Sequence, residues 1–235
     1  MSNQSIKELW EKSGSADLLK GKTFQEIFDN APDKALELSD TYLRCIDEGT
    51  PGGMHLAGSG VLYDNAAKDL KGKISGVYSH EGCGAVKLYA EQQNITNKDI
   101  ETLAQDRARQ IANKVGVPYL GHISFGEMRR PAQLHTARVI YYDGTGKLDP
   151  THIAALPLGF VISRALISDL LYAKTELEVA VSIATGEHGF GRLFAKESPL
   201  YIVVVSSAFN IESLINETVE ITQKFDNVKV ERIVI

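Results

Sequence analysis

Cysteine is scarce in this chain, since Cys45 and Cys83 are its only two thiols among 235 residues. This excludes a disulfide framework, and a reducing compartment disfavours even the single possible bridge. Apolar runs such as 153–161 and 200–205 fall well short of the roughly 20 residues that span a bilayer. The N-terminal residues also lack the apolar core of a signal peptide, so we expect a cytoplasmic protein without a membrane partner.

Positive charge is in deficit as well. Lysine and arginine number 25 against 30 aspartates and glutamates, which gives a formal net charge of -5. No basic stripe follows the chain, so nucleic-acid binding has no electrostatic basis. What remains is the composition of an ordinary globular protein, with 43% hydrophobic and 23% charged residues.

The chain shows no internal repeat, no low-complexity tract and no long linker. We therefore expect residues 1–235 to form a single α/β domain with an N-terminal helical arm over about residues 1–38. Apolar strand runs alternate with helical segments, which predicts a mostly parallel central sheet flanked by helices.

The expected elements follow from hydrophobic spacing. Two helices are expected in the first forty residues, a glycine-rich loop over 48–59 and a hairpin-type turn over 143–146. Strands are predicted at 41–46, 74–79, 137–142, 178–184, 200–206 and 229–235. Further helices are predicted at 61–70, 83–93, 100–115, between 152 and 174, and at 211–224.

Residues of metal-ligand type lie where two predicted strands end. Cys45 is near the end of the first strand, and His80 and Cys83 stand in the turn after the second. Ligands of parallel sheets gather at the carboxyl ends of the strands. Thiolate and imidazole are typical zinc ligands, and the helix after Cys83 would stabilise its thiolate. Asp47, two residues after Cys45, would leave the strand on the same face and is either a fourth ligand or an acceptor for zinc-bound water.

These residues stand in motifs that resemble the β-class carbonic anhydrases. The run Cys45-Ile46-Asp47-Glu48-Gly49 matches the family's first motif as far as the aspartate. The segment 55–59 loosely matches the middle motif, and 74–87, which contains His-x-x-Cys-Gly, closely matches the last. The similarity covers roughly residues 41–90.

The resemblance implies a Rossmann-like fold of β-carbonic anhydrase type that forms a homodimer or a higher homo-oligomer. It also implies a lyase in which Cys45, His80 and Cys83 hold Zn²⁺, with Asp47 beside the metal. The reaction would be the reversible hydration of carbon dioxide to bicarbonate by a zinc-bound hydroxide.

The chain departs from the family at Gly49, where members carry an arginine that keeps the aspartate off the metal. An unpaired Asp47 would bind zinc and close the site. Arg44, Arg129 and Arg130 are candidates to replace that arginine from another direction. Two alternatives follow: a relative that acts on carbon disulfide or carbonyl sulfide, and a non-catalytic zinc-binding protein, which Gly49 favours.

Further candidates for positions beside the metal or substrate are Gly84, His55, Arg129 and His188. His55 is a site residue or a surface-loop histidine, and His188 is a proton shuttle or, more often, a turn histidine. Arg129 belongs to the segment 127–131, which could bind an anion but more often forms a solvated loop. We expect structural roles for the remaining histidines, His122, His135 and His152.

Overall fold

The computed structural model describes residues 3–12, 19–50, 52–132 and 134–235. Three helices come first, namely α1 (Asn3–Lys12), α2 (Phe24–Phe28) and α3 (Pro32–Ala35). They lie in the expected N-terminal helical arm, of which residues 1–2 and 13–18 fall outside the described residues.

The first half of the fold then contains the strands β1 (Tyr42–Arg44), β2 (Met54–His55), β3 (Gly76–His80) and β4 (Tyr119–Ile123). Its helices are the 3₁₀ turn η1 (Ala57–Ser59), α4 (Ala66–Leu70), α5 (Gly84–Gln92) and α6 (Ile100–Val115).

The second half contains the strands β5 (Val139–Asp143), β6 (Phe160–Ile162), β7 (Leu200–Ser206) and β8 (Val228–Val234). Its longer helices are α7 (Leu170–Thr185) and α8 (Ile211–Thr222). Three 3₁₀ turns complete it: η2 (Pro150–His152), η3 (Arg164–Leu166) and η4 (Gly191–Leu193).

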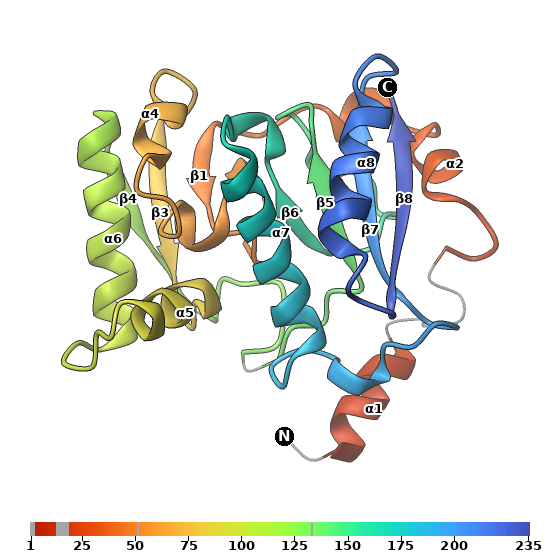
Figure 1. Ribbon diagram of the computed structural model, residues 1–235, viewed down its shortest axis with the longest axis horizontal. Helices are drawn as coiled ribbons and strands as arrows, with labels where there is room; N and C mark the ends of the chain where they lie inside the picture. The colour runs from red at the N-terminus through yellow and green to blue at the C-terminus, as the bar shows by residue number, and fades with distance from the viewer. Residues whose placement is uncertain (1–2, 13–18, 51, 133) are drawn as a thin grey trace.

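The strands form two four-stranded sheets, ordered β2-β1-β3-β4 and β6-β5-β7-β8, and every pair of neighbours is parallel (Figure 1). The predicted fold class, α/β with parallel strands flanked by helices, is therefore confirmed. Both sheets have the same order, because the second repeats the first with each number raised by four. The structure contains a topological repeat that the sequence does not display.

The two sheets meet at their edge strands. Ser163 donates its N–H to the carbonyl of His55 at 2.9 Å, and the N–H of His55 returns a 2.9 Å bond to the Ser163 hydroxyl. Val161 donates to the carbonyl of Ile46 at 3.1 Å. Figure 1 shows that β3 and β4 end at the bottom of the view while β8 ends at the top. The halves thus face each other edge to edge with opposite strand directions.

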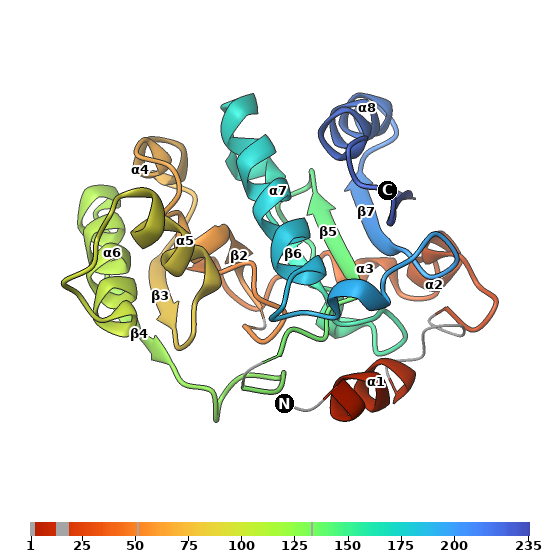
Figure 2. The ribbon, with the colours of Figure 1, turned by 60° about the horizontal axis from the view of Figure 1, so that its bottom comes forward.

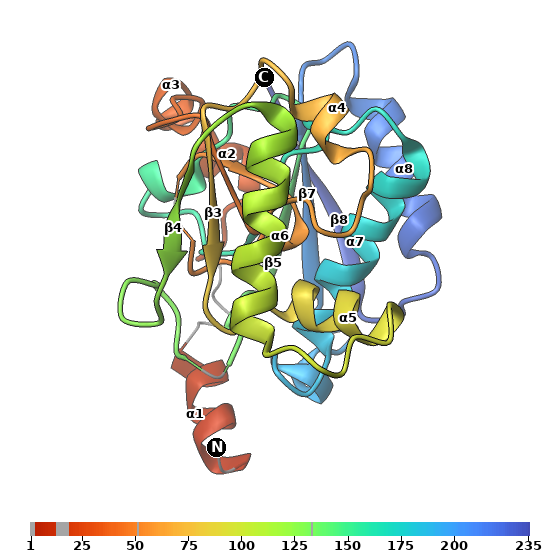
Figure 3. The ribbon, with the colours of Figure 1, turned by 90° about the vertical axis from the view of Figure 1, so that its left-hand side faces the viewer.

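Alternation along the strands of the second sheet divides its side chains between two cores. Val139 and Tyr141 face one side with α2 and α3, while Ile140 and Tyr142 face the other with α7. Figure 3 shows the sheets between these two layers of helices. Because such strands are buried on both faces, they read as continuous apolar runs in the sequence.

Two predicted elements have the observed bounds, the helix at 100–115 and the strand at 200–206. The predicted elements at 74–79, 83–93, 137–142, 211–224 and 229–235 correspond to β3, α5, β5, α8 and β8, with ends shifted by at most two residues. The predicted strand at 178–184 is wrong, because these residues belong to α7. Val179, Ala180 and Val181 are all buried, so this stretch reads as a continuous apolar run like that of a buried strand, which periodicity alone does not distinguish from a buried helix segment. The helix expected between 152 and 174 is also wrong over its first part, which contains β6.

The predicted hairpin-type turn at 143–146 is wrong as well, since β5 pairs only with parallel strands among the described residues. The turn is instead folded by Asp143, whose carboxylate accepts N–H bonds from Thr145 at 2.8 Å and Leu148 at 3.1 Å. The short strands β2 and β4 were not predicted. Within the described residues, no helix is long and apolar enough to cross a bilayer.

The junction between the sheets gives a stability prediction. Replacing Ser163 with alanine leaves the buried N–H of His55 without its acceptor, so we expect a loss of about 1–3 kcal/mol in the free energy of unfolding. Urea denaturation measures it. Ser213→Ala, at an exposed position of α8, is the control and should stay within about 0.5 kcal/mol of the parent. Equal stability of the two variants would contradict a stabilising role for the hydrogen bond between His55 and Ser163.

Candidate metal centre

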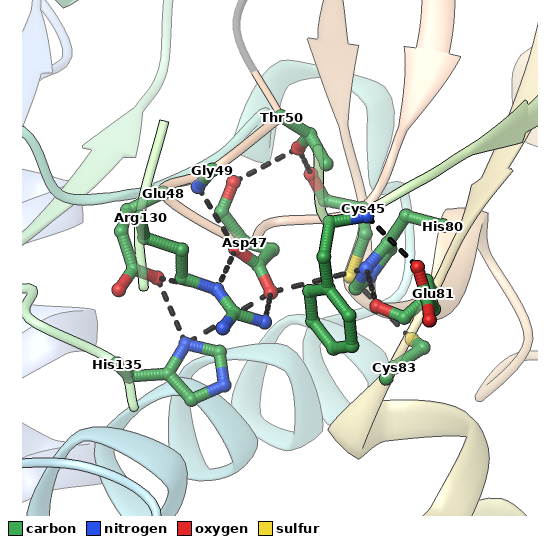
Figure 4. A network of polar contacts seen from close by, with 12 residues as sticks. Cys45, Asp47, Glu48, Gly49, Thr50, His80, Glu81, Cys83, Arg130 and His135 are labelled. Atoms are coloured by element: carbon green, nitrogen blue, oxygen red, sulfur yellow. Dashed lines mark hydrogen bonds and ion pairs between the residues drawn. The ribbon is translucent and has the colours of Figure 1, made fainter. Parts of the chain in front are cut away.

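Cys45, His80 and Cys83 converge at the carboxyl end of the first sheet (Figure 4). Cys45 directly follows β1, His80 ends β3, and Cys83 is the residue before α5. One ligand atom from each lies within 4.8 Å of the others, and all three residues are buried. The structure therefore contains a cluster that could hold a metal ion, as the sequence predicted.

The separation of the two sulfurs matches a tetrahedral site. Their Sγ atoms lie 3.8 Å apart, far beyond the roughly 2.05 Å of a disulfide. Two thiolates bound to one zinc ion at about 2.3 Å with tetrahedral angles are about 3.8 Å apart. Without the ion, burial raises the pKa of the Cys45 thiol well above its usual range, and the neighbouring Cys83 adds to this.

One ring nitrogen of His80 forms a hydrogen bond, and the other has no partner among the described residues. Nδ1 lies 2.9 Å from the carbonyl of Glu81, to which it donates as an N–H. Nε2 is buried and has no hydrogen-bond partner among the described residues. Such an arrangement is typical of metal-binding histidines, because the bond at one ring nitrogen fixes the tautomer that leaves the other lone pair free.

The protein also provides for the negative charge that metal binding requires. The N–H of Gly58 points at the Cys45 sulfur over 3.2 Å, and Cys83 stands at the N-terminus of α5, where the helix dipole favours an anion. Burial lowers the pKa of His80, but the nearby Cys45 outweighs it and raises that pKa to about 9. Metal binding would therefore displace protons from Cys45 and His80.

Local sequence explains the turn that holds His80 and Cys83. Gly82 has a φ of 67°, and a Cβ there would lie 2.4 Å from the ring of Phe125. Glu81 accepts the N–H of Phe125 at 2.9 Å, and Glu101 accepts the N–H of Gly82 at the same distance. The turn is thus fastened to both the loop after β4 and helix α6.

Asp47 is paired, although the residue two positions on is a glycine. Arg130 donates from Nε to Oδ1 at 2.7 Å and from Nη2 to Oδ2 at 2.8 Å, which makes a bidentate ion pair (Figure 4). Burial alone would raise the pKa of Asp47, but the Arg130 hydrogen bonds and the charges of His80 and His135 hold it well below its usual range. Both carboxylate oxygens are held by the arginine, and Asp47 does not belong to the three-ligand cluster.

Gly49 makes room for this arginine. A Cβ at Gly49 would lie 2.8 Å from Cε of Met128 and 2.9 Å from Cγ of Arg130. The Gly49 N–H also donates to Asp47 at 2.8 Å. Arg130 therefore packs into the space that a side chain at position 49 would need.

A second layer surrounds the ion pair. His135 Nδ1 lies 2.9 Å from Glu48, whose other oxygen accepts the N–H of Thr136 at 2.7 Å. Asp47, Glu48 and His135 also lie close enough to form a metal-type cluster. The guanidinium of Arg130 lies 2.7 Å from Asp47 and 4.0 Å from Glu48, and Glu48 also accepts from Thr136, so this cluster is better described as an ion-pair network.

A cavity of about 780 Å³ reaches the centre from the side of Cys83 and Arg130. Its walls combine residues that follow β4, residues of α5 and the C-terminal part of α7, and Ile6 of α1 also lines it. These elements lie at the lower edge of Figure 1, which Figure 2 brings toward the viewer. The cavity thus connects Cys83 of the cluster, and Arg130, which pairs with Asp47, to solvent.

The other predicted site residues have different outcomes. His55 is buried, and its Nδ1 binds the carbonyl of Cys45 at 2.7 Å; burial lowers its pKa to about 4, so it supports the Cys45 backbone as a neutral ring. Gly84 lines the cavity, and His188 lines it as an exposed residue. Arg129 is exposed, and its backbone N–H donates to the carbonyl of Gly49 at 3.2 Å.

Sequence reasoning named Arg130 only as one of three candidate arginines and missed His135. The segment 127–131 was expected to be a solvated loop, yet Arg130 is buried, with 7% exposure. His135 was expected to have a structural role, and the structure places it on Glu48 and in the cavity wall. Asp47 and Cys45 follow β1 and do not lie on a strand, so the face-sharing argument for them was wrong.

Comparisons with family models, with characterised proteins and with solved structures give no significant match to this chain. The resemblance to β-class carbonic anhydrases therefore rests on the motifs and stays a prediction.

The packing around Gly49 gives a direct test. Gly49→Ala would force Met128 and Arg130 aside, so we expect a loss of about 1–3 kcal/mol in the free energy of unfolding. Gly84→Ala is the matched control, because its Cβ would meet only the flexible tip of Ile183 at 3.4 Å. Denaturant unfolding of both variants measures the difference. Equal effects would show that the space beside Gly49 is not limiting.

A buried acid under η1 gives a pH prediction. Glu176 is fully buried, accepts the N–H of Ala57 at 2.6 Å, and burial raises its pKa to about 7. An unfolded glutamate titrates near about 4.3, so folding takes up a proton between these values and stability falls as pH rises from about 4 to 7.

Glu176→Gln removes that titration. Relative to the parent, the variant should gain about 3 kcal/mol between pH 4 and pH 7, measured by denaturant unfolding at several pH values. Glu178→Gln, on the same helix and ion-paired with Lys224 at its surface, is the control and should show no such trend. A stability difference that is constant with pH would contradict a raised pKa.

Proposed function

We propose that the chain is a zinc enzyme in which Cys45, His80 and Cys83 hold the ion and Asp47 assists the reversible hydration of carbon dioxide. The observation that carries the proposal is the Asp47–Arg130 ion pair beside the three-ligand cluster. It supplies the aspartate–arginine pair that the motif resemblance requires, from a position 83 residues away in the chain.

The donor set supports zinc in a catalytic arrangement. Two thiolates and one imidazole are common zinc ligands, and three protein ligands leave a fourth position for water. Bound zinc supplies a nucleophile at neutral pH by lowering the pKa of its water toward about 7. A structural zinc site would instead be closed by a fourth side chain, and the described residues offer none within the cluster.

Asp47 is the residue that would decide between these two arrangements. Its two oxygens are engaged by Arg130 and Gly49, and its Oδ2 lies 3.9 Å from His80 Nδ1. A carboxylate held this way stays ionised and can still accept a further hydrogen bond on a free lone pair. We therefore assign Asp47 the role of orienting the reacting water, while Arg130 keeps it off the metal.

The cavity fits a small neutral substrate. Phe125, Val179 and Ile183 are among its apolar walls, and His135 and His188 add imidazoles between the ion-pair network and solvent. Apolar walls favour carbon dioxide over water near Cys83. An imidazole can both accept and donate a proton, so these two residues can carry the released proton outward.

The second half of the chain lacks the ligands among its described residues. In the second sheet, β5 and β7 hold the places that β1 and β3 have in the first. β5 ends at Asp143 and β7 at Ser206, whereas Cys45 follows β1 and His80 ends β3. Asp143 is used to fold its own turn. We therefore expect one zinc site per chain. The predicted homodimer would have to use a surface other than the β2 edge, which β6 covers.

Metal analysis and stopped-flow hydration test the proposal together. We expect about one zinc per chain and a zinc-dependent hydration rate across roughly pH 6.5–9, bracketing the pKa of zinc-bound water. Cys83→Ala should lose both. Arg130→Met should keep the zinc but lose at least about tenfold in rate, because Asp47 is freed to move onto the metal.

Arg129→Met is the matched control, since this neighbouring arginine is exposed, and it should retain both zinc and rate. Less than half an equivalent of zinc, with both cysteines freely alkylated, would overturn the whole proposal. Full zinc without hydration would leave a metal-binding protein or an enzyme for another electrophile, which assays with carbonyl sulfide and carbon disulfide distinguish.

A further inference from the structure

Arg138, just before β5, is a buried charge for which the described residues provide no counter-ion. Its exposed fraction is 2%, and both Nε and Nη1 are buried without a hydrogen-bond partner. The guanidinium lies over the ring of Trp10, 3.6 Å from the centroid. An indole face attracts a cation but accepts no in-plane hydrogen bond, so the N–H donors of Nε and Nη1 remain unsatisfied.

Leaving such a group unpaired is costly. A buried charge without a partner destabilises a protein strongly, so buried arginines are normally matched to a carboxylate or another anion. Burial lowers the pKa of Arg138 only to about 10, so the side chain stays protonated at neutral pH. Native structures rarely contain such an orphan unless something not in the chain completes it.

Arg138 lines a cavity of about 680 Å³ that is separate from the one at the metal centre. Lys20 and Lys22 also line it, and none of its described lining residues is acidic. The opposite wall is apolar and includes Ile153, Leu156 and further residues of the segment 153–158. The cavity therefore combines positive charge with an apolar surface, at a volume that suits a small organic ligand.

We propose that this cavity binds a small organic anion, a carboxylate or a phosphate with an apolar body, whose charged group is held by Arg138. The guanidinium carries several N–H donors, which suit the oxygens of a carboxylate or a phosphate. Lys20 and Lys22 are exposed and attract the anion at the mouth. The apolar body packs against the wall formed by 153–158.

The only tryptophan of the chain reports on this site. Because Trp10 lies against the Arg138 guanidinium, an anion bound there should change its fluorescence. The full-length protein is titrated with octanoate, hexyl phosphate, inorganic phosphate and 1-octanol. We expect saturable changes with octanoate or hexyl phosphate, at least tenfold weaker binding of inorganic phosphate, and none with 1-octanol.

Two sets of variants test the charged group. Arg138→Gln should weaken binding by about 10- to 100-fold, because it removes a charge-assisted hydrogen bond from the anion. The double variant Lys20→Ala/Lys22→Ala removes only exposed side chains, so it should fold normally, bind several-fold more weakly and show a smaller salt dependence. Lys114→Ala, on the exposed surface of α6, is the control and should bind like the parent.

The titrations also define failure. Equal binding of 1-octanol and octanoate would overturn the anion assignment. Parent-like affinity in both the double-lysine variant and a folded Arg138→Gln variant would overturn it as well. Equal binding of inorganic phosphate and hexyl phosphate would overturn the apolar part. Preference between octanoate and hexyl phosphate identifies carboxylate or phosphate as the group recognised. Zinc content is measured in parallel, and its loss would not affect this conclusion.

Discussion

The ion pair between Asp47 and Arg130 connects the parts of the molecule that form the metal centre. It ties the loop after β1 to the segment that follows β4, and both partners are nearly fully buried, with side-chain exposures of 2% and 3%. Breaking a buried pair leaves an uncompensated charge that costs about 3–5 kcal/mol. The pair therefore fixes the loop that follows β1 against the segment that follows β4, and the Cys83 turn is fastened to that same segment by the hydrogen bond between Glu81 and Phe125.

The two halves of the chain use one topology for different purposes. Each has four parallel strands in the same order, and the halves join edge to edge through His55 and Ser163. His55 also binds the carbonyl of Cys45, so the junction directly supports a residue of the candidate metal cluster. The second half has no ligand set of its own among the described residues. It covers the edge of the first sheet and, through α7, forms one wall of the cavity.

The features that could be predicted from the sequence are those that depend on residues close together in the chain. The three ligands could be found because His80 and Cys83 share one turn, and the helix at 100–115 because its apolar spacing is amphipathic. Arg130 could be named only as one of three candidates, since its contact with Asp47 spans 83 residues. The clue was Gly49, whose missing side chain is the space that Arg130 fills. The repeat of topology was invisible because the halves share strand order without sharing residues.

Two buried arginines show how the same side chain serves different ends. Arg130 meets a carboxylate through two hydrogen bonds, so its charge is neutralised within the chain and its effect is on Asp47. Within the described part of the chain, Arg138 meets the face of Trp10, and its Nε and Nη1 have no hydrogen-bond partner. Burial costs the two guanidiniums a similar desolvation penalty. Only the first recovers it from the described chain, so the second is the one whose environment is completed by a ligand.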